Sequence, residues 1–230
     1  MDGIYEDLDW LGLDHDGAAI VQSKRVAAYA KALDQLRRQD LVYACFCTRA
    51  EIAQSLTAPH GDAGSQYPGT CRPLPDDPER RASTPHCWRL DVAKALKRTG
   101  LPGWTEHDGT VHQSMRSDFG DSILARKDAP SSYHLACVVD DAAAGVNMVV
   151  RGEDLRPSTP TQRLLQILLN LPDPQYLHHR LVTHEGGRRL AKRDLAPTLK
   201  AMREAGVDGP GLRSQLLEGQ LPLGFRLSEA

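Results

Sequence analysis

Apolar side chains recur at helical spacing in three parts of the chain, and each part predicts a helix. The first lies within 2–13, and the second is capped by Ser23 and ends near Asp40. The third begins at Thr159, because the following Pro160 is favoured in a first helical turn. The three apolar stripes are Ile4, Leu8 and Leu11; Val26, Ala30, Leu33 and Leu36; and Leu164, Leu165 and Leu168.

Short, continuous apolar runs predict strands, because they lack the polar face of a surface helix. Such runs occupy 41–44, 87–92, 122–126, 135–139 and 146–150. The runs at 135–139 and 146–150 are typical of a sheet that is buried on both faces. The stretch 197–230 predicts small helices between Gly and Pro breaks. Since strands, loops and helices alternate, the predicted fold class is α/β.

Composition and charge are those of an ordinary globular protein. The chain has 230 residues, of which 40% are hydrophobic and 25% charged, a balance that excludes disorder and fibrous repeats. Its formal net charge of -2 conceals basic clusters, such as Arg188-Arg189 with Lys192-Arg193, that could contact phosphates or form a solvated surface. No signal peptide and no apolar run of about 18 residues occur, so we expect a soluble, cytoplasmic protein.

Three cysteines and a tyrosine form a candidate metal site. Cys45 and Cys47 are one residue apart, and Tyr67 and Cys71 follow a segment rich in Gly and Pro. Thiolates and a phenolate could complete a closed, four-coordinate site, which is the usual form of structural zinc. Metal binding would order a region that buries little apolar surface. The alternatives are buried cysteines without a metal, or a fourth ligand from the pair His86-Cys87.

Several segments resemble, in the same order, motifs of the class I glutamyl-tRNA synthetase group. They are W-L-G-L at 10–13 with Q-S-K-R at 22–25, Y-A-C-F-C-T-R-A-E-I at 43–52, Y-H-L-A at 133–136 with V-D-D at 139–141, V-V-R-G-E-D-L at 149–155, and L-A-K-R at 190–193. The V-R-G-E-D-L segment after a strand is the most specific. The Y-x3-C completion of the metal set and the chain length resemble the shorter glutamyl-Q branch of this group.

The resemblance implies a Rossmann-like class I catalytic domain interrupted by a zinc-containing insertion. It divides the chain into a partial catalytic domain at 1–43, a zinc-binding, tRNA-facing insertion at 44–115, the second half of the catalytic domain at 116–195, and a C-terminal helical segment at 196–230. The family's first strands and its H-I-G-H nucleotide signature would precede residue 1. We therefore expect a domain that lacks its first strands, with an impaired nucleotide site, because that signature binds phosphates at a helix N-terminus.

The resemblance also implies a reaction and the residues that perform it. Enzymes of the glutamyl-Q branch activate glutamate with ATP and Mg²⁺, then transfer it to queuosine in the anticodon of tRNA(Asp). Tyr133 and Arg151 correspond to glutamate contacts, since an arginine can bind a carboxylate bidentately. Lys192 corresponds to the catalytic lysine that binds the ATP phosphates. One structural Zn²⁺ per chain, held by the candidate metal site, and a monomeric state are also expected.

Each of these residues has a structural alternative. Arg151 could pair with Glu153 or Asp154, and Tyr133 could simply pack. Lys192 could belong to a basic surface turn, because its neighbours differ from the family's K-M-S-K-S loop. For the chain as a whole, the alternatives are the N-terminal part of a glutamyl-tRNA synthetase, or a zinc-stabilised tRNA-binding remnant without catalysis.

Overall fold

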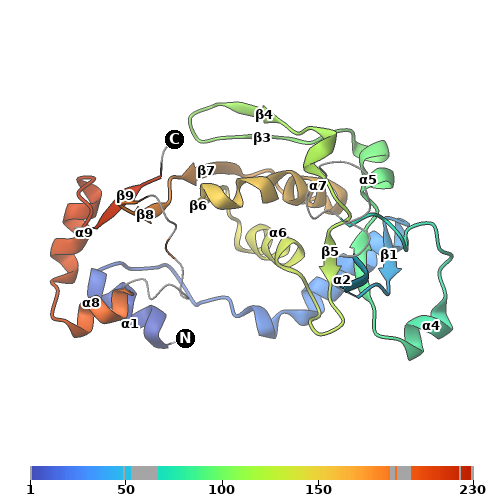
Figure 1. Cartoon of the computed structure of the whole chain (residues 1–230), viewed down its shortest axis with the longest axis horizontal. Coiled ribbons are helices and arrows are strands. Elements are labelled where there is room, and N and C mark those ends of the chain that lie inside the picture. Colours follow the sequence, from blue (N-terminus) through green and yellow to red (C-terminus); the bar gives the residue numbers. More distant parts are fainter. Residues whose placement is uncertain are drawn as a thin grey trace. The chain divides into compact units, whose positions relative to one another are not determined.

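The structure is a computed structural model in which the chain forms two compact units (Figure 1). One unit comprises Val21–His178, and the other comprises Met1–Ile20 together with His179–Ala230. The described residues are 2–48, 50–52, 67–186, 190, 198–222 and 224–228. Among them, no helix has both the length and the apolar character needed to cross a membrane.

A three-stranded antiparallel sheet lies in the Val21–His178 unit. Its order is β1 (Val42–Cys45), β2 (Cys87–Leu90) and β5 (Ile123–Ala125). The register sets Ala44 opposite Trp88 and Cys45 opposite Cys87. Because successive side chains of a strand point to opposite faces, these two pairs occupy different faces of the sheet.

Four helices pack around the hydrophobic core of this unit. They are α2 (Val26–Arg38), α5 (Val92–Thr99), α6 (Tyr133–Ala144) and α7 (Thr159–Leu169). Helix α7 packs against α2, α5 and α6, and both α6 and α7 lie at the centre of the view in Figure 1. The core side chains with no exposed surface are Leu36, Leu90, Ala95, Leu124, Leu135, Leu164 and Leu165.

Two further pairs of strands position the residues around α7. The hairpin of β3 (Gly103–Thr105) and β4 (Val111–Gln113) packs through β3 against α7 (Figure 1). Strands β6 (Met148–Gly152) and β7 (Gln175–His179) form a two-stranded sheet. A 3-10 helix, η3 (Glu153–Ser158), connects β6 to α7. The described part of this unit also contains the short helix α4 (Pro78–Ser83) and the 3-10 helices η1 (Gln22–Lys24) and η2 (Arg116–Asp118).

The second unit combines helices from both ends of the chain. Helix α1 (Asp2–Leu11) packs against α8 (Leu199–Glu204) and α9 (Gly209–Leu217), and β8 (Val182–His184) pairs with β9 (Phe225–Leu227). Arg203 forms an ion pair with Glu6 at 2.8 Å. Gly209 lies so close to α1 that a Cβ atom there would be 2.0 Å from the carbonyl oxygen of Trp10.

Most of the predicted elements are confirmed, including the helices at 2–13 and from Thr159 and the strands at 41–44 and 122–126. The predicted strand at 87–92 ends at Leu90, because the Asp91 side chain accepts from the Lys94 backbone N–H and caps α5. After the second cysteine of the candidate metal site, 50–52 are helical. Thr48 and Glu51 exchange side-chain to backbone hydrogen bonds there, the pattern of a capping box.

The strand predicted at 135–139 is wrong, because these residues lie in α6. The Ser132 hydroxyl accepts from the Leu135 backbone N–H at the start of this helix, and Gly145 ends it in the left-handed conformation. An apolar run of five residues has the same appearance in a buried helix and in a buried strand. The helix caps therefore determined the structure.

Two smaller expectations are also wrong. Ser23 does not cap α2, because it lies within the 3-10 helix η1, and the N-cap position, Arg25, makes no side-chain capping bond. The strand predicted at 146–150 forms as β6, but it is not buried on both faces, since Val150 is 60% exposed. Within the described part of the chain β6 pairs only with β7, which leaves one of its edges uncovered.

Replacing Leu164 with alanine is expected to destabilise the protein by about 2–5 kcal/mol, because the side chain has 0% exposure and its removal leaves a cavity in the core. The matched control is Ile167→Ala on the same helix, where the side chain is 42% exposed. Urea unfolding followed by circular dichroism measures both. Equal losses of stability for the two variants would contradict this location of the core.

Candidate active site

Arg151 carries a buried positive charge near the end of β6, where it is only 9% exposed. Its Nε donates to Nε2 of His178 at 3.1 Å. Its terminal nitrogens donate to Oε1 of Gln162 at 2.5 Å and to Oγ1 of Thr159 at 2.6 Å. All three acceptors belong to uncharged side chains, and within the described part of the chain no carboxylate forms an ion pair with Arg151. The guanidinium is therefore held in place without being neutralised.

Tyr133 lies beside this guanidinium, at the first position of α6. It is 49% exposed, so its ring does not simply pack in the core. Burial raises the pKa of Tyr133, whereas Arg151 and Gln162 act to lower this pKa, which places the hydroxyl within interaction range of both. The structure thus brings together the two residues that correspond to glutamate contacts. Lys192, which corresponds to the catalytic lysine, lies outside the described residues.

Gln162 adds a buried amide to this site. Its Oε1 accepts from Arg151, which fixes the orientation of the amide. Its Nε2 is buried and has no acceptor at normal hydrogen-bond distance, although the amide interacts with the hydroxyl of Tyr133. Buried donors normally have acceptors, so this amide provides a binding position for an acceptor atom of a ligand.

His178 and Glu106 lie behind Arg151. The imidazole of His178 is fully buried, and its Nδ1 is 2.8 Å from Oε1 of Glu106. Burial lowers the pKa of His178, although Glu106 opposes this effect. Burial raises the pKa of Glu106, but hydrogen bonds from His178 and Trp104 outweigh it, so the net shift is downward. A neutral imidazole therefore lies between a carboxylate and the guanidinium.

A cleft of about 740 Å³ opens beside Tyr133. It is bounded by the start of α6, the region where η3 leads into α7, and the loop that carries Tyr67. Polar and charged side chains line much of it, among them Arg89, Arg126, His134 and Thr161. The cleft is large enough for a small polar metabolite.

The candidate metal residues also come together. The Sγ atoms of Cys45, Cys47 and Cys71 all lie within 4.8 Å of one another. The hydroxyl of Tyr67 is 3.6 Å from Sγ of Cys47 and accepts from the backbone N–H of Cys71 at 2.8 Å. The pKa of Cys45 is lowered to about 4, mainly because of a side-chain hydrogen bond with Cys87. Three sulfurs and one phenol oxygen in a buried cluster fit a four-coordinate zinc ion.

His86 is not part of this cluster. Its Nδ1 lies 3.2 Å from the carbonyl oxygen of Thr84, and its ring contacts Phe46 and Trp88. The alternative in which His86 supplies a metal ligand is therefore wrong, whereas its neighbour Cys87 packs against the cluster opposite Cys45. The sheet register explains this, since Trp88 projects from the opposite face to Cys45.

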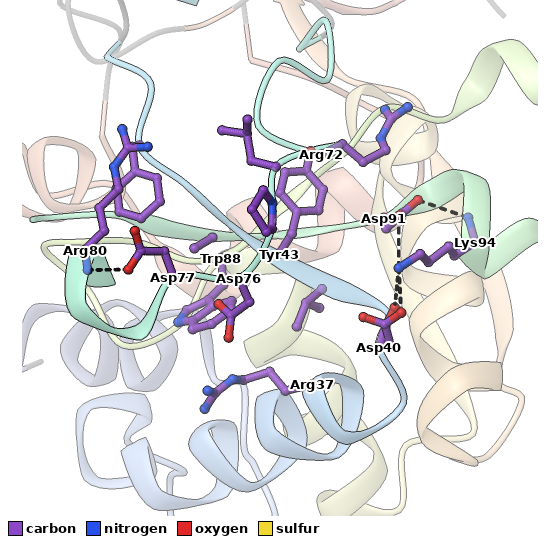
Figure 2. A pocket seen from close by; sticks show the side chains of 15 residues that line it. Arg37, Asp40, Tyr43, Arg72, Asp76, Asp77, Arg80, Trp88, Asp91 and Lys94 are labelled. Atoms are coloured by element: carbon purple, nitrogen blue, oxygen red, sulfur yellow. Dashed lines mark hydrogen bonds and ion pairs between the residues drawn. The ribbon is translucent and has the colours of Figure 1, made fainter. Parts of the chain in front are cut away.

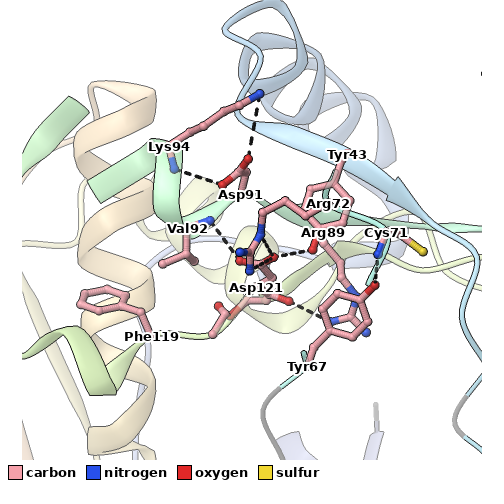
Figure 3. A network of polar contacts seen from close by, with 12 residues as sticks. Tyr43, Tyr67, Cys71, Arg72, Arg89, Asp91, Val92, Lys94, Phe119 and Asp121 are labelled. Atoms are coloured by element: carbon pink, nitrogen blue, oxygen red, sulfur yellow. Dashed lines mark hydrogen bonds and ion pairs between the residues drawn. The ribbon is translucent and has the colours of Figure 1, made fainter. Parts of the chain in front are cut away.

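A buried carboxylate, that of Asp121, supports the loops around the cysteines. Figure 3 shows it among Tyr43, Arg72 and the backbone N–H of Val92, all of which donate to it. Arg89 donates to its backbone oxygen at 2.8 Å. These bonds connect β1, β2 and the segment before β5 to the loop that follows Cys71.

A second cavity, of about 230 Å³, lies around Trp88 (Figure 2). Lys94 is 2.6 Å from Asp40, and the guanidinium of Arg37 lies 4.5 Å from the centre of the Trp88 ring. The guanidinium of Arg80 lies over the ring of Phe46, 4.0 Å from its centre. The charges here are balanced within the protein, so this cavity offers no excess charge to a ligand.

Comparison with known proteins identifies the family. The model of the catalytic domain of class I tRNA synthetases for glutamate and glutamine matches residues 1–228. The chain belongs to this synthetase family.

Two relatives are called glutamyl-Q tRNA(Asp) synthetase. The one from Nocardia farcinica is 48% identical over 203 residues, which cover 87% of this chain and 62% of that protein. The one from Rhodobacter capsulatus is 39% identical over 223 residues, covering 91% of this chain and 79% of the relative. The chain thus spans less than two thirds of the Nocardia relative.

A glutamate tRNA ligase from Elizabethkingia meningosepticum, solved in complex with its amino acid, shares the fold. The TM-score is 0.66 at 23% identity, over 84% of this chain and 42% of that one. The expected α/β fold of a class I synthetase catalytic domain is therefore confirmed.

The sequence did not reveal four residues of this candidate site. Three of them are Glu106, Gln162 and His178, and the fourth is Thr159 as a hydrogen-bond acceptor for Arg151. Thr159 was noted only as the start of a helix. Glu106 and His178 belong to no recognisable motif and are 72 positions apart. The one available signal was that an arginine at the end of an apolar strand needs acceptors for its N–H groups.

Replacing Asp121 with asparagine is expected to lower stability by about 1–3 kcal/mol, because the new amide N–H group must face donors that the carboxylate now accepts from. The control, Asp128→Asn, removes a surface partner of Arg126 and should cost at most about 1 kcal/mol. Urea unfolding at pH 7 compares the two. If Asp121→Asn is no worse than its control, the network does not support the loops.

Proposed function

We propose that this protein activates glutamate with ATP and transfers it to queuosine in the anticodon of tRNA(Asp). The similarity to two glutamyl-Q tRNA(Asp) synthetases supports the reaction and the acceptor. The single structural observation that carries the proposal is Arg151, a buried cation held only by uncharged side chains. Such a group binds an acidic ligand strongly, because desolvation strengthens its attraction to a carboxylate.

Glutamate is recognised by the group of donors around Arg151. The guanidinium has five N–H groups and uses three of them within the protein, so two remain for a carboxylate oxygen pair. The amide nitrogen of Gln162 is a further donor at this place, and Tyr133 lines the cleft. An amide side chain of similar size, as in glutamine, offers one acceptor oxygen in place of two and sets its NH2 group against a donor, which disfavours its binding.

Activation joins the glutamate α-carboxylate to the α-phosphate of ATP. The carboxylate oxygen attacks phosphorus, pyrophosphate leaves, and a mixed anhydride remains. Lys192 meets the charge on the phosphates, together with Mg²⁺ that enters with ATP. Queuosine then attacks the activated carbonyl, and AMP departs. Because tRNA is the acceptor, the protein acts in the cytoplasm. It works as a monomer.

A structural Zn²⁺ is held by Cys45, Cys47, Tyr67 and Cys71. The metal would link the end of β1 to the segment 67–71, within a tRNA-facing insertion at 44–115. The surrounding segments 1–43 and 116–195 form the Rossmann-like catalytic domain, and 196–230 form its helical C-terminal segment. Four protein ligands would leave the zinc no open position, so its role would be structural.

The test of this function is the transfer of labelled glutamate to tRNA(Asp). We expect labelling of tRNA(Asp) that contains queuosine but lacks its 3′-terminal adenosine, and none of tRNA(Asp) that has guanine in place of queuosine. Arg151→Gln should raise the glutamate concentration for half-maximal transfer by at least about thirtyfold, since a buried charged pair is lost. Arg98→Gln, on the exposed end of α5, is the control.

The opposite labelling pattern, in which transfer depends on the 3′ adenosine and ignores queuosine, would mean that the protein aminoacylates tRNA instead. If wild-type protein neither binds nor transfers glutamate, the proposed substrate is wrong. Unchanged glutamate dependence in Arg151→Gln would remove Arg151 from the binding site.

Metal analysis of the purified protein should find about one zinc per chain. Cys71→Ser should lower the zinc content to near zero, because serine is a poor ligand beside thiolates. Cys137→Ser, which changes a cysteine outside the cluster, should leave the content unchanged. Zinc retained at the wild-type level in Cys71→Ser would contradict this ligand set.

A further inference from the structure

A continuous chain of hydrogen bonds leads from the β3–β4 hairpin to Arg151. Glu106 follows β3, and its carboxylate lies 2.8 Å from Nδ1 of His178. On the other side of the imidazole, Nε2 lies 3.1 Å from Nε of Arg151 and 3.2 Å from Oγ1 of Thr159. The three charged or titratable groups thus form a line, with His178 fully buried in the middle.

Only one tautomer of His178 satisfies these contacts. The Nε–H of arginine can donate but cannot accept, so Nε2 of His178 must carry a lone pair. The imidazole proton then resides on Nδ1, where the carboxylate of Glu106 accepts it. With the proton on Nε2, two donors would face each other at 3.1 Å.

Glu106 is well fixed for this task. Nε1 of Trp104 donates to the same carboxylate oxygen at 3.1 Å, and Arg156 is 3.3 Å from it. His112 is 3.9 Å away and stacks on the ring of Trp104. The charged groups that face His178 are therefore Glu106, Arg151 and Arg156, and the ring of Tyr176 stacks on its imidazole at 5.8 Å.

The position of this carboxylate solves a conflict at the site. A buried guanidinium needs compensation for its lost hydration. A carboxylate in direct contact would supply it, but it would also occupy the donors that a carboxylate ligand needs. Placing the anion one imidazole away keeps negative charge near Arg151 and leaves the outer N–H groups of the guanidinium free. The imidazole meanwhile fixes the plane of the guanidinium through Nε.

We propose that Glu106 and His178 are positioning residues that orient Arg151 for the carboxylate of its substrate, with Glu106 selecting the Nδ1-protonated tautomer of His178. This proposal rests on the proposed function, in which Arg151 binds glutamate. The β3–β4 hairpin is then part of the specificity apparatus, although none of its residues contacts the ligand.

The variant Glu106→Gln tests the proposal, because it preserves shape while the new amide can donate to Nδ1 and stabilise the wrong tautomer. A comparable loss of the tautomer-holding carboxylate in serine proteases is strongly damaging. We expect L-glutamate binding, measured by calorimetry, to weaken about 10- to 100-fold. This is the range of losses when the hydrogen-bond partner of a metal-binding histidine is removed. Asp108→Asn, an exposed change in the same hairpin, should bind as wild type does.

Nitrogen-15 spectra of histidine side chains give a readout that a purely structural role would not move. In wild-type protein at pH 7, His178 should be neutral with its proton on Nδ1, and in Glu106→Gln the Nε2-protonated form should increase. The His178→Gln variant assigns the signal by its absence. This measurement needs no ligand, so it tests the tautomer even if the protein does not bind glutamate.

The possible outcomes are distinct. Failure of wild-type protein to bind L-glutamate counts against the proposed function, while the tautomer result still stands or falls separately. Suppose that wild-type protein binds glutamate and that Glu106→Gln is folded. If the glutamate affinity of this variant is then within about twofold of the wild-type affinity, instead of about 10- to 100-fold weaker, the positioning role is wrong. Should Glu106→Gln fail to fold, a wild-type His178 protonated on Nε2 or on both nitrogens would still overturn the proposal.

Discussion

The buried positive charge of Arg151 is the constraint around which this half of the molecule is organised. A guanidinium removed from water must have its N–H groups satisfied, or folding becomes unfavourable. The acceptors come from α7, through Thr159 and Gln162, and from β7, through His178. Strand β6, helix α7 and strand β7 therefore have to meet in one arrangement, and that arrangement leaves the cation without a carboxylate in direct contact.

The sheet β1–β2–β5 separates two environments. On one face, Cys45 and its partner cysteines lie next to Tyr67, whose ring carries the guanidinium of Arg89 at 3.9 Å. On the other face, Trp88 contacts arginines whose charges are balanced by nearby aspartates. Because side chains alternate along a strand, the register of Cys45 with Cys87 decides which residues can reach the cysteine cluster.

The cysteine cluster and the arginine site border the same cleft. Tyr67, a member of the cluster, and Tyr133, a neighbour of Arg151, both line it. Asp121 is also at its wall and holds Arg72 from the loop after Cys71. A change in the geometry of the cysteines therefore alters the shape of one wall of the cleft. This proximity gives the proposed zinc a means of influencing the binding site without contacting the substrate.

The sequence by itself determined the family, most of the helices and three strands of the sheet, because caps, amphipathic periods and the V-R-G-E-D-L and C-x-C motifs are local signals. It also identified the four residues that meet in the cysteine cluster. Local signals failed at 135–139, where an apolar run fits a strand and a buried helix equally well. Only the tertiary structure decided that Gln162, His178 and Glu106 surround Arg151. Hydrogen-bond partners far apart in sequence are chosen by how helices and strands pack, and no spacing along the chain records that choice.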